Sequence, residues 1–482
     1  MYLSLLKVSY RHTSIIILAH LNQHQYHDDD DDDDDKMGFF RAKQTPQGPL
    51  PLISIDLAKP GNALFNPDHR VVYKPNDLVS GTVFLNTPIA IQPQAIEVSL
   101  WGESRTWIRY DDSNTNSNGN KTSSYKHYRD NAPLFTVTLN LLEKPRQLIS
   151  GESYTFPFQF RMPEGTNNSR ADVYKDPNDI RWTTLPHHLP PTFFFGSSPS
   201  SPDNASISYG VTARLICPGT GTGPQNQDAI TTSQELIFQP LNPHAHLLSP
   251  SAPLSLCPHT KPFILQSSVL TGQNPSTLGF RQRMHDRFSS STPKLDFEFG
   301  IQIPDLLASG TEFRFLTSFR VLNKCEKVVQ IPAVKFKILK LELRDITFFR
   351  APRDWNCRDD IDGTAYADGR THAPTHASGW IGQEDIVYRE KKTVLNALPS
   401  DAVVVELDEE NIAGEKDEKK TQQKDYVDCW FSSRIPGFTP PSFTSFAVSR
   451  LYRVKVRARI ECGDKKFEYE AEGHVRGMGS CV

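Results

Sequence analysis

Histidines offer the first candidates for chemistry, because imidazole side chains are common ligands of zinc. His372 and His376 lie four residues apart, and His187 is followed directly by His188. Pro374 lies between the first two, so they cannot share a regular helix face, and no third ligand is spaced to join either pair. We therefore interpret these histidines as loop residues and expect no bound metal or other cofactor.

Motifs that commonly mark an enzyme are absent from the sequence. It contains no G-x-S-x-G turn, no glycine-rich phosphate loop and no H-E-x-x-H. Active sites can also be assembled from distant residues, so an enzyme whose loops, chiefly residues 352–384, build a site on a β scaffold stays as an alternative. The expected class is a protein without catalytic activity.

A row of cations is the strongest candidate for a binding site. Within residues 450–460, four basic residues alternate with five apolar ones. The basic residues are Arg453, Lys455, Arg457 and Arg459, and the apolar ones are Tyr452, Val454, Val456, Ala458 and Ile460. This period of two predicts a strand with one buried and one cationic face. The cations are either a solvated face that discourages aggregation, or a surface that docks anionic lipid headgroups or an acidic or phosphorylated peptide.

Two proline-rich pieces resemble the P-P-x-Y ligand of WW domains. They begin at Pro190 and Pro440, and each ends in phenylalanine, at Phe193 and Phe443. WW domains bind a preformed polyproline helix together with an aromatic anchor. Because the tyrosine hydroxyl is missing from both pieces, we interpret each as a turn that precedes a strand.

Composition excludes several classes of partner. With 482 residues the chain predicts two or three domains, and 36 prolines and 27 glycines indicate a loop-rich β protein. The net charge is −3, and the run Asp28–Asp35 supplies eight negative charges. Residues before Met37 sum to −5, so residues 37–482 carry about +2, and we expect no nucleic-acid partner.

Seven cysteines, an odd number with no C-x-x-C pair, favour free thiols in the cytoplasm. No stretch is long and apolar enough to predict a membrane span. The Asp run cannot bury apolar surface, so residues 1–36 are expected to form a disordered extension.

The stretch Ser150–Pro163 is the clearest strand. One row consists of Tyr154, Phe156, Phe158, Phe160 and Met162, while the side chains between them are mostly polar. A row of aromatic residues this dense needs a facing apolar surface, which a second sheet supplies. Pro157 lacks a backbone N–H and therefore places the strand at a sheet edge or a bulge.

Other pieces around this strand occur in a recognisable order. They are Y-x-P-x-D-x-V-x-G-x-V from Tyr73, I-x-V-x-L-x-G from Ile96, G-x-x-Y-x-F-P-F-x-F-x-x-P from Gly151, L-P-P-x-F from Leu189 and I-x-Y-x-V-x-A-x-L from Ile207. Over residues 50–240 this succession resembles the amino-terminal domain of arrestin-related (α-arrestin) proteins. The resemblance implies a β-sandwich lobe, usually followed by a second one.

The pattern resumes beyond a proline-rich stretch, Pro240–Pro262, that has the composition of a linker. Leu295–Ile303 alternates without a break, and the apolar parity shifts within Val334–Ile346, which predicts a β-bulge. The expected fold is all-β, with two tandem antiparallel immunoglobulin-like β-sandwiches over residues 37–245 and 246–482. The second is expected to carry loop insertions at 352–384 and 399–425.

Function follows from the resemblance alone. It implies a non-catalytic adaptor that binds cytosolic tails of membrane proteins and links them to endocytosis, trafficking or ubiquitination. A retromer-type arrestin-fold sorting subunit is the alternative. Many α-arrestins recruit a ubiquitin ligase through P-P-x-Y, so any recruitment by this chain is expected to be indirect. The implied location is cytoplasmic, peripherally at the plasma membrane or endosomes, with an anionic membrane surface as a further partner.

Overall fold

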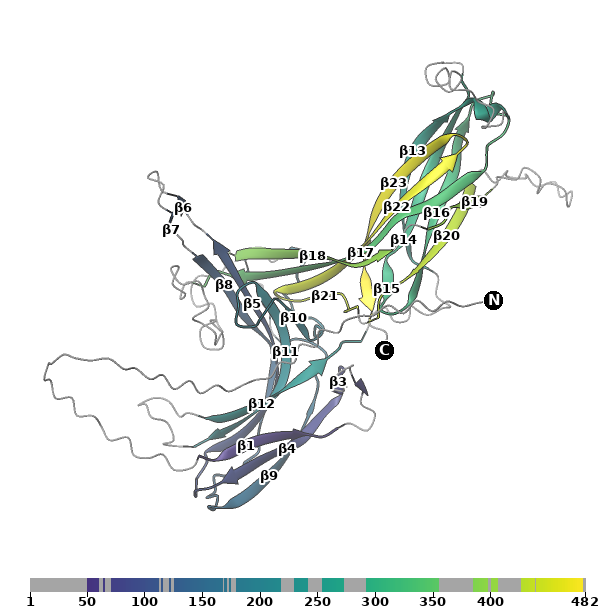
Figure 1. The fold of residues 1–482 in the computed structure, drawn as a ribbon. Helices are drawn as coiled ribbons and strands as arrows, with labels where there is room; N and C mark the ends of the chain where they lie inside the picture. Colours follow the sequence, from purple (N-terminus) through teal and green to yellow (C-terminus); the bar gives the residue numbers. More distant parts are fainter. Residues whose placement is uncertain are drawn as a thin grey trace, which may run out of the picture. The chain divides into compact units, whose positions relative to one another are not determined.

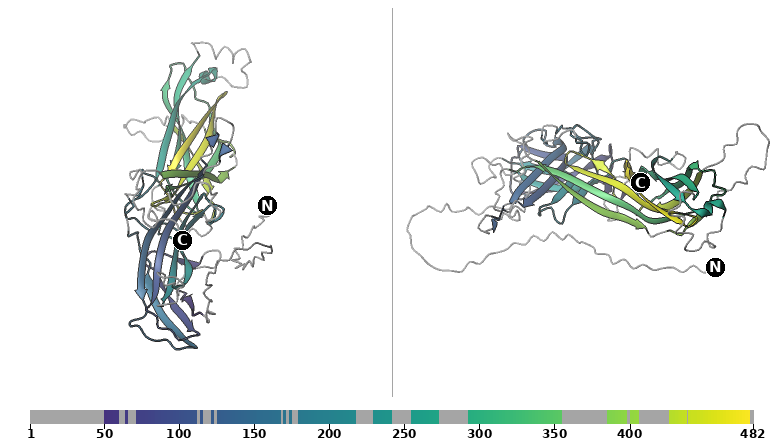
Figure 2. Two further views of the ribbon diagram at one scale, coloured as in Figure 1. Left: turned by 90° about the vertical axis from the view of Figure 1, so that its left-hand side faces the viewer. Right: turned by 90° about the horizontal axis from the view of Figure 1, so that it is seen from above.

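The computed structural model of the chain is built almost entirely from strands (Figure 1). Figure 2 shows these strands from two further sides. The residues that the structure describes are 50–59, 64–65, 71–111, 114–115, 121–122, 125–167, 169–170, 173–174, 179–217, 229–241, 254–272, 292–354, 385–397, 400–405, 426–437 and 439–479. The predicted extension 1–36, most of both predicted loop insertions, and His372 with His376 lie outside these residues. Residues 49–482 belong to one compact unit.

The first sandwich contains two sheets. Three strands form the smaller sheet, in the order β1 (Leu52–Leu57), β4 (Leu78–Thr87) and β9 (Glu152–Arg161). The larger sheet runs β2 (Leu64–Phe65), β3 (Val71–Tyr73), β12 (Ile230–Phe238), β11 (Asn204–Ile216), β5 (Ala95–Asp111) and β8 (Tyr125–Asn140), with β10 (Phe193–Phe195) on β11. The short strands β6 (Asn114–Thr115) and β7 (Lys121–Thr122) pair with each other.

Strand β9 agrees with its prediction from the sequence. Phe156, Phe158 and Phe160 are buried in the core between the two sheets. Pro157 lies on an edge strand, because β9 pairs only with β4 in the described part of the chain. The missing N–H of Pro157 therefore interrupts no pairing beyond β9.

Strand β8 departs from the expected alternation at its end. Phe135 is buried, whereas Val137 and Leu139 are each 39% exposed. Strand β8 is the edge of the larger sheet, and the facing sheet has only three strands. The alternation of apolar residues predicted the strand correctly. It could not show that the facing sheet has fewer strands and leaves Val137 and Leu139 partly uncovered.

The second sandwich also contains two main sheets. One has the order β13 (Leu256–Gln266), β14 (Lys294–Pro304), β16 (Glu312–Lys324) and β20 (Tyr426–Arg434). The other runs β18 (Asp385–Ala397), β17 (Val334–Pro352), β22 (Val448–Cys462) and β21 (Phe443–Thr444), with β19 (Val403–Val405) on β17 and β23 (Lys465–Val475) on β22. Strands β15 (Leu306–Ala308) and β24 (Gly477–Gly479) form a small parallel pair, and a short 3₁₀ turn spans Ser268–Thr271.

Of three expectations for the second sandwich, one is confirmed and two differ from the structure. The predicted bulge is confirmed, because the pairing of β17 with β22 shifts between Ile338 and Lys340. The proline-rich stretch expected as linker ends as strand β13, which tolerates Pro258 and Pro262 because it is an edge strand. The segment 399–425 contains the short strand β19.

One strand contributes to both hydrophobic cores. Near its start, β17 buries Val334 and Phe336 in the core of the second sandwich. Near its end, Phe349 and Ala351 belong to the core of the first, together with Phe446–Val448. The two cores are therefore joined through β17 and the start of β22.

Candidate functional site

The predicted cation row lies where the sequence places it. On β22, Tyr452, Val454, Val456, Ala458 and Ile460 are each no more than 1% exposed and belong to the second core. Arg453, Lys455, Arg457 and Arg459 occupy the alternate positions and point to the other face of the sheet. The two-faced strand that the sequence predicted is confirmed.

Each of these cations forms an ion pair with a glutamate on β23. Arg453 contacts Glu472 at 3.2 Å, and Lys455 contacts Glu470. Glu468 accepts from two arginines, Arg457 at 2.6 Å and Arg459 at 2.5 Å. The pKa of Glu468 is lowered, chiefly by the hydrogen bond from Arg459 and then by that from Arg457. We call these seven residues of β22 and β23 the charge ladder.

Strand β17 adds further positive charge on the other side of β22. Lys337 is paired in register with Arg459, and Lys340 with Arg457. Lys340 contacts Glu342 at 2.6 Å, whereas no described carboxylate forms an ion pair with Lys337. Arg457 and Arg459 share Glu468, and Glu461, 3.9 Å from Arg459, is shared in turn with Lys466 at 3.3 Å. Positive charge is therefore in excess at this end of the sheet. Arg457 has the most accessible side chain of the predicted row, at 50%.

A buried polar cluster joins the two sandwiches. Asp130 on β8 accepts from Arg170 and from the hydroxyl of Tyr174. Burial, with Asp130 close by, raises the pKa of Tyr174 well above its usual value. The guanidinium of Arg350, on β17, lies 3.7 Å from the Tyr174 ring centroid and 4.8 Å from that of Trp182. Aromatic rings thus supply much of the surroundings of a cation that is only 2% exposed.

Hydrogen bonds to the backbone complete the surroundings of Arg350. Its Nε and Nη2 donate to the carbonyl of Phe446, at 3.1 and 2.9 Å. The carbonyl of Arg350 accepts from the hydroxyl of Thr106, on β5 of the first sandwich, at 2.8 Å. A second buried cation, Arg129, lies 4.1 Å from the centroid of the Trp107 ring and 3.8 Å from Asp354, which follows β17. Both arginines therefore hold parts of the chain that are distant in sequence.

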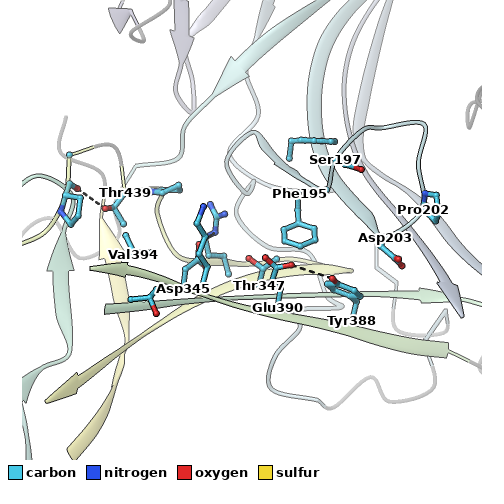
Figure 3. Close-up of a pocket in the computed structure, with 18 residues that line it drawn as sticks. Phe195, Ser197, Pro202, Asp203, Asp345, Thr347, Tyr388, Glu390, Val394 and Thr439 are labelled. Atoms are coloured by element: carbon cyan, nitrogen blue, oxygen red, sulfur yellow. Dashed lines mark hydrogen bonds and ion pairs between the residues drawn. The ribbon is translucent and has the colours of Figure 1, made fainter. Parts of the chain in front are cut away.

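A cavity of about 840 Å³ is lined by residues of both sandwiches, and Figure 3 shows this lining. Phe195 comes from the first sandwich, and Tyr388 from β18 of the second, with ring centroids 5.8 Å apart. Asp345 contacts Arg450 at 3.2 Å; burial raises the Asp345 pKa against the lowering effect of Arg450. Aromatic rings beside charges of both signs can receive an extended peptide by stacking, hydrogen bonds and ion pairs.

A comparison with families of known proteins now identifies the first sandwich. Residues 63–171 match the family described as arrestin (or S-antigen), N-terminal domain. Residues 63–171 of the first sandwich are an arrestin N-terminal domain. A search of curated proteins finds no relative of this chain. The match covers strands β2 to β9 and supports an arrestin-related protein. Strands β1 and β10 to β12 of the first sandwich, the second sandwich and the charge ladder lie beyond it.

The arrestin domain points to a family of non-enzymatic proteins. No three His, Cys, Asp or Glu side chains of the described residues come together as a metal site. Of the predicted histidines, His187 lies near the second sandwich: Nε2 is 3.1 Å from the Ser445 hydroxyl, and Nδ1 is 2.9 Å from the Leu185 carbonyl. Burial lowers the His187 pKa. Among the described residues, no helix has the length and apolar character of a membrane span.

The two P-P-x-F pieces prove to be structural. In the first sandwich Pro190, Pro191 and Phe193 are buried, so this copy presents no free polyproline face. Phe443, from the second copy, packs edge-on against Phe193, with ring centroids 5.4 Å apart. The first carbonyl of each copy accepts from a tyrosine hydroxyl: Tyr209 donates to Pro190 and Tyr452 to Pro440. Both copies precede strands β10 and β21, as predicted.

Sequence reasoning missed the partners of the cation row. Glutamates at every second position of 468–472 follow Gly463 and Asp464, which form the turn of the hairpin β22–β23. That spacing was a usable signal, because a tight hairpin brings alternate residues of its two strands to one face. Nothing comparable in the sequence marks Asp130, Tyr174 or Arg350 as neighbours.

Proposed function

We propose that the protein is a non-catalytic arrestin-like adaptor. It binds cytosolic tails of membrane proteins and links them to endocytosis, trafficking or ubiquitination, from the cytoplasmic side of the plasma membrane or endosomes. The observation that carries this proposal is the arrestin domain at residues 63–171, joined through one buried core to a second sandwich. Ligase recruitment is indirect in this scheme, because Phe193 is buried and Phe443 packs against it.

The charge ladder and Lys337 are the part of this protein that we assign to an anionic membrane surface. Each cation near such a surface contributes about 1 kcal/mol, and salt screens the attraction. The glutamates of β23 offset most of the row, so binding is expected to be weak and to depend on the excess around Lys337, Arg457 and Arg459. Weak attraction suits an adaptor that also needs its cargo in order to stay at the membrane.

Vesicle sedimentation with two matched variants tests the assignment. Phosphatidylcholine vesicles with and without phosphatidylserine are compared across a salt series. One variant replaces Arg453, Lys455, Arg457 and Arg459 by serine; the other replaces Glu468, Glu470 and Glu472 by glutamine. Opposite effects are expected, with less sedimentation of the first and more of the second. Equal sedimentation of both folded variants and the parent would leave the ladder as a solvated face.

The adaptor role itself requires an assay in cells. Proximity labelling with the full-length chain is expected to enrich membrane proteins with long cytosolic tails together with trafficking or ubiquitination factors. The serine variant of the ladder is the matched control, because it alters the membrane contact and leaves the arrestin domain intact. A labelled set without membrane proteins would contradict the proposal.

A further inference from the structure

Sheet edges in this protein mostly carry features that oppose pairing with another strand. Edge strand β9 contains Pro157, and edge strand β13 contains Pro258 and Pro262. Edge strand β18 exposes Lys391 and Lys392. Prolines and lysines of this kind prevent an unpaired edge from adding a further strand.

Strand β20 is an edge without these features. Its nine residues, Tyr426–Arg434, contain no proline, glycine or lysine, and its pairing with β16 shows no register shift. Among the described strands it pairs only with β16, and no described strand pairs with its other edge. Tyr426 and Trp430 are 48% and 49% exposed on its outer face. An open, regular edge with exposed aromatic residues is suited to strand pairing.

The sequence of β20 is complementary to itself when two copies run antiparallel. Full overlap of the strand places Trp430 opposite Trp430, at the centre of the nine residues. Tyr426 then faces Arg434, a pair suited to cation–π contact, and Asp428 faces Ser432, a pair suited to a hydrogen bond. All five residues are exposed and lie on the outer face of the strand, so the three kinds of pair form together.

We infer that the partner of this edge is a second copy of the chain, in a two-fold symmetric dimer that joins the two β20 strands. Symmetry requires that each contact occurs twice, and the pairs 426–434 and 428–432 meet this requirement without placing like charges together. The four-stranded sheets of the two copies become one continuous sheet. This inference is independent of the adaptor role, because it rests on β20 alone.

Sedimentation of the full-length protein across a concentration series tests the dimer. The parent is expected to show a reversible monomer–dimer equilibrium. Trp430→Lys should weaken association by at least about tenfold, because an aromatic pair at the two-fold axis is replaced by two like charges. Leu322→Lys changes a similarly exposed apolar residue on β16, one strand in from this edge and beyond the end of β20, and should associate like the parent.

A crosslink distinguishes the β20 pair from association elsewhere. Directly opposed side chains have Cβ atoms about 4.5–5.5 Å apart, close enough for a disulfide after modest adjustment. Trp430→Cys should therefore form a covalent dimer under mild oxidation, whereas Leu322→Cys and the parent should not. The inference would be overturned by a parent that is monomeric at every concentration. It would equally be overturned by a dimer that Trp430→Lys leaves unchanged and that Trp430→Cys does not crosslink.

Discussion

Replacing Arg350 by alanine should loosen the contact between the two sandwiches. The side chain is 2% exposed, stacks on Tyr174 and Trp182, and donates two hydrogen bonds to Phe446. Hydrogen bonds from a charged donor contribute about 1.5–3 kcal/mol, and each buried cation–π contact up to about 2 kcal/mol. The cost of burying the charge offsets part of this sum. We expect the free energy of unfolding to fall by about 3 kcal/mol.

Urea unfolding followed by tryptophan fluorescence measures this change, because Trp182 contacts Arg350 directly. Arg350→Met keeps most of the buried volume and separates the role of the guanidinium from that of packing. Arg457→Ala removes a half-exposed arginine and should change stability by less than about 1 kcal/mol. The first sandwich should also begin to unfold separately in Arg350→Ala. A single transition with an unchanged midpoint would refute this account of the contact.

Three further outcomes are expected. Phe158→Asp should unfold the arrestin domain by burying a charge between its sheets, whereas Gln159→Asp on the exposed face should melt like the parent. Gly102→Val should cost about 1–3 kcal/mol in thermal unfolding, because even a Cβ there would lie 2.7 Å from the Tyr209 ring. Burial lowers the His187 pKa, so the stability that neutral His187 contributes is present above its unfolded pKa of about 6.5 and lost as pH falls through the lower folded value. Unfolding free energies at neutral and mildly acidic pH should show this slope, and His187→Gln should flatten it.

Much of the fold could be predicted because a strand with one buried face shows an alternating pattern of apolar residues in its own sequence. Phe156, Phe158 and Phe160 are two residues apart, and each is buried on the same face of β9. The shift of parity near Ile338 located a bulge correctly for the same reason. These signals depend on neighbouring positions, and the physical cause, alternation along an extended chain, acts over the same short distance.

The rest could not be predicted because its causes are distant in sequence. Tyr174 and Arg350 are in contact although they are far apart in the sequence. Neither residue has a flanking pattern that indicates the other. The cation row was identified, but its electrostatic character depends on the register of β23 and on Lys337 of β17. The exposure of Val137 follows from the width of the facing sheet, which no single strand encodes.

The shared core has a consequence for synthesis of the chain on the ribosome. Strands β1 to β12 of the first sandwich end at Phe238, but Phe349 and Val448 are also members of its core. At about 5–20 residues per second, the interval between the emergence of Phe238 and Val448 is roughly 10 to 40 s. For that time the first half must keep apolar surface uncovered while the second half is made. Chaperones that bind nascent chains would therefore encounter apolar surface of the first sandwich that is buried in the complete protein.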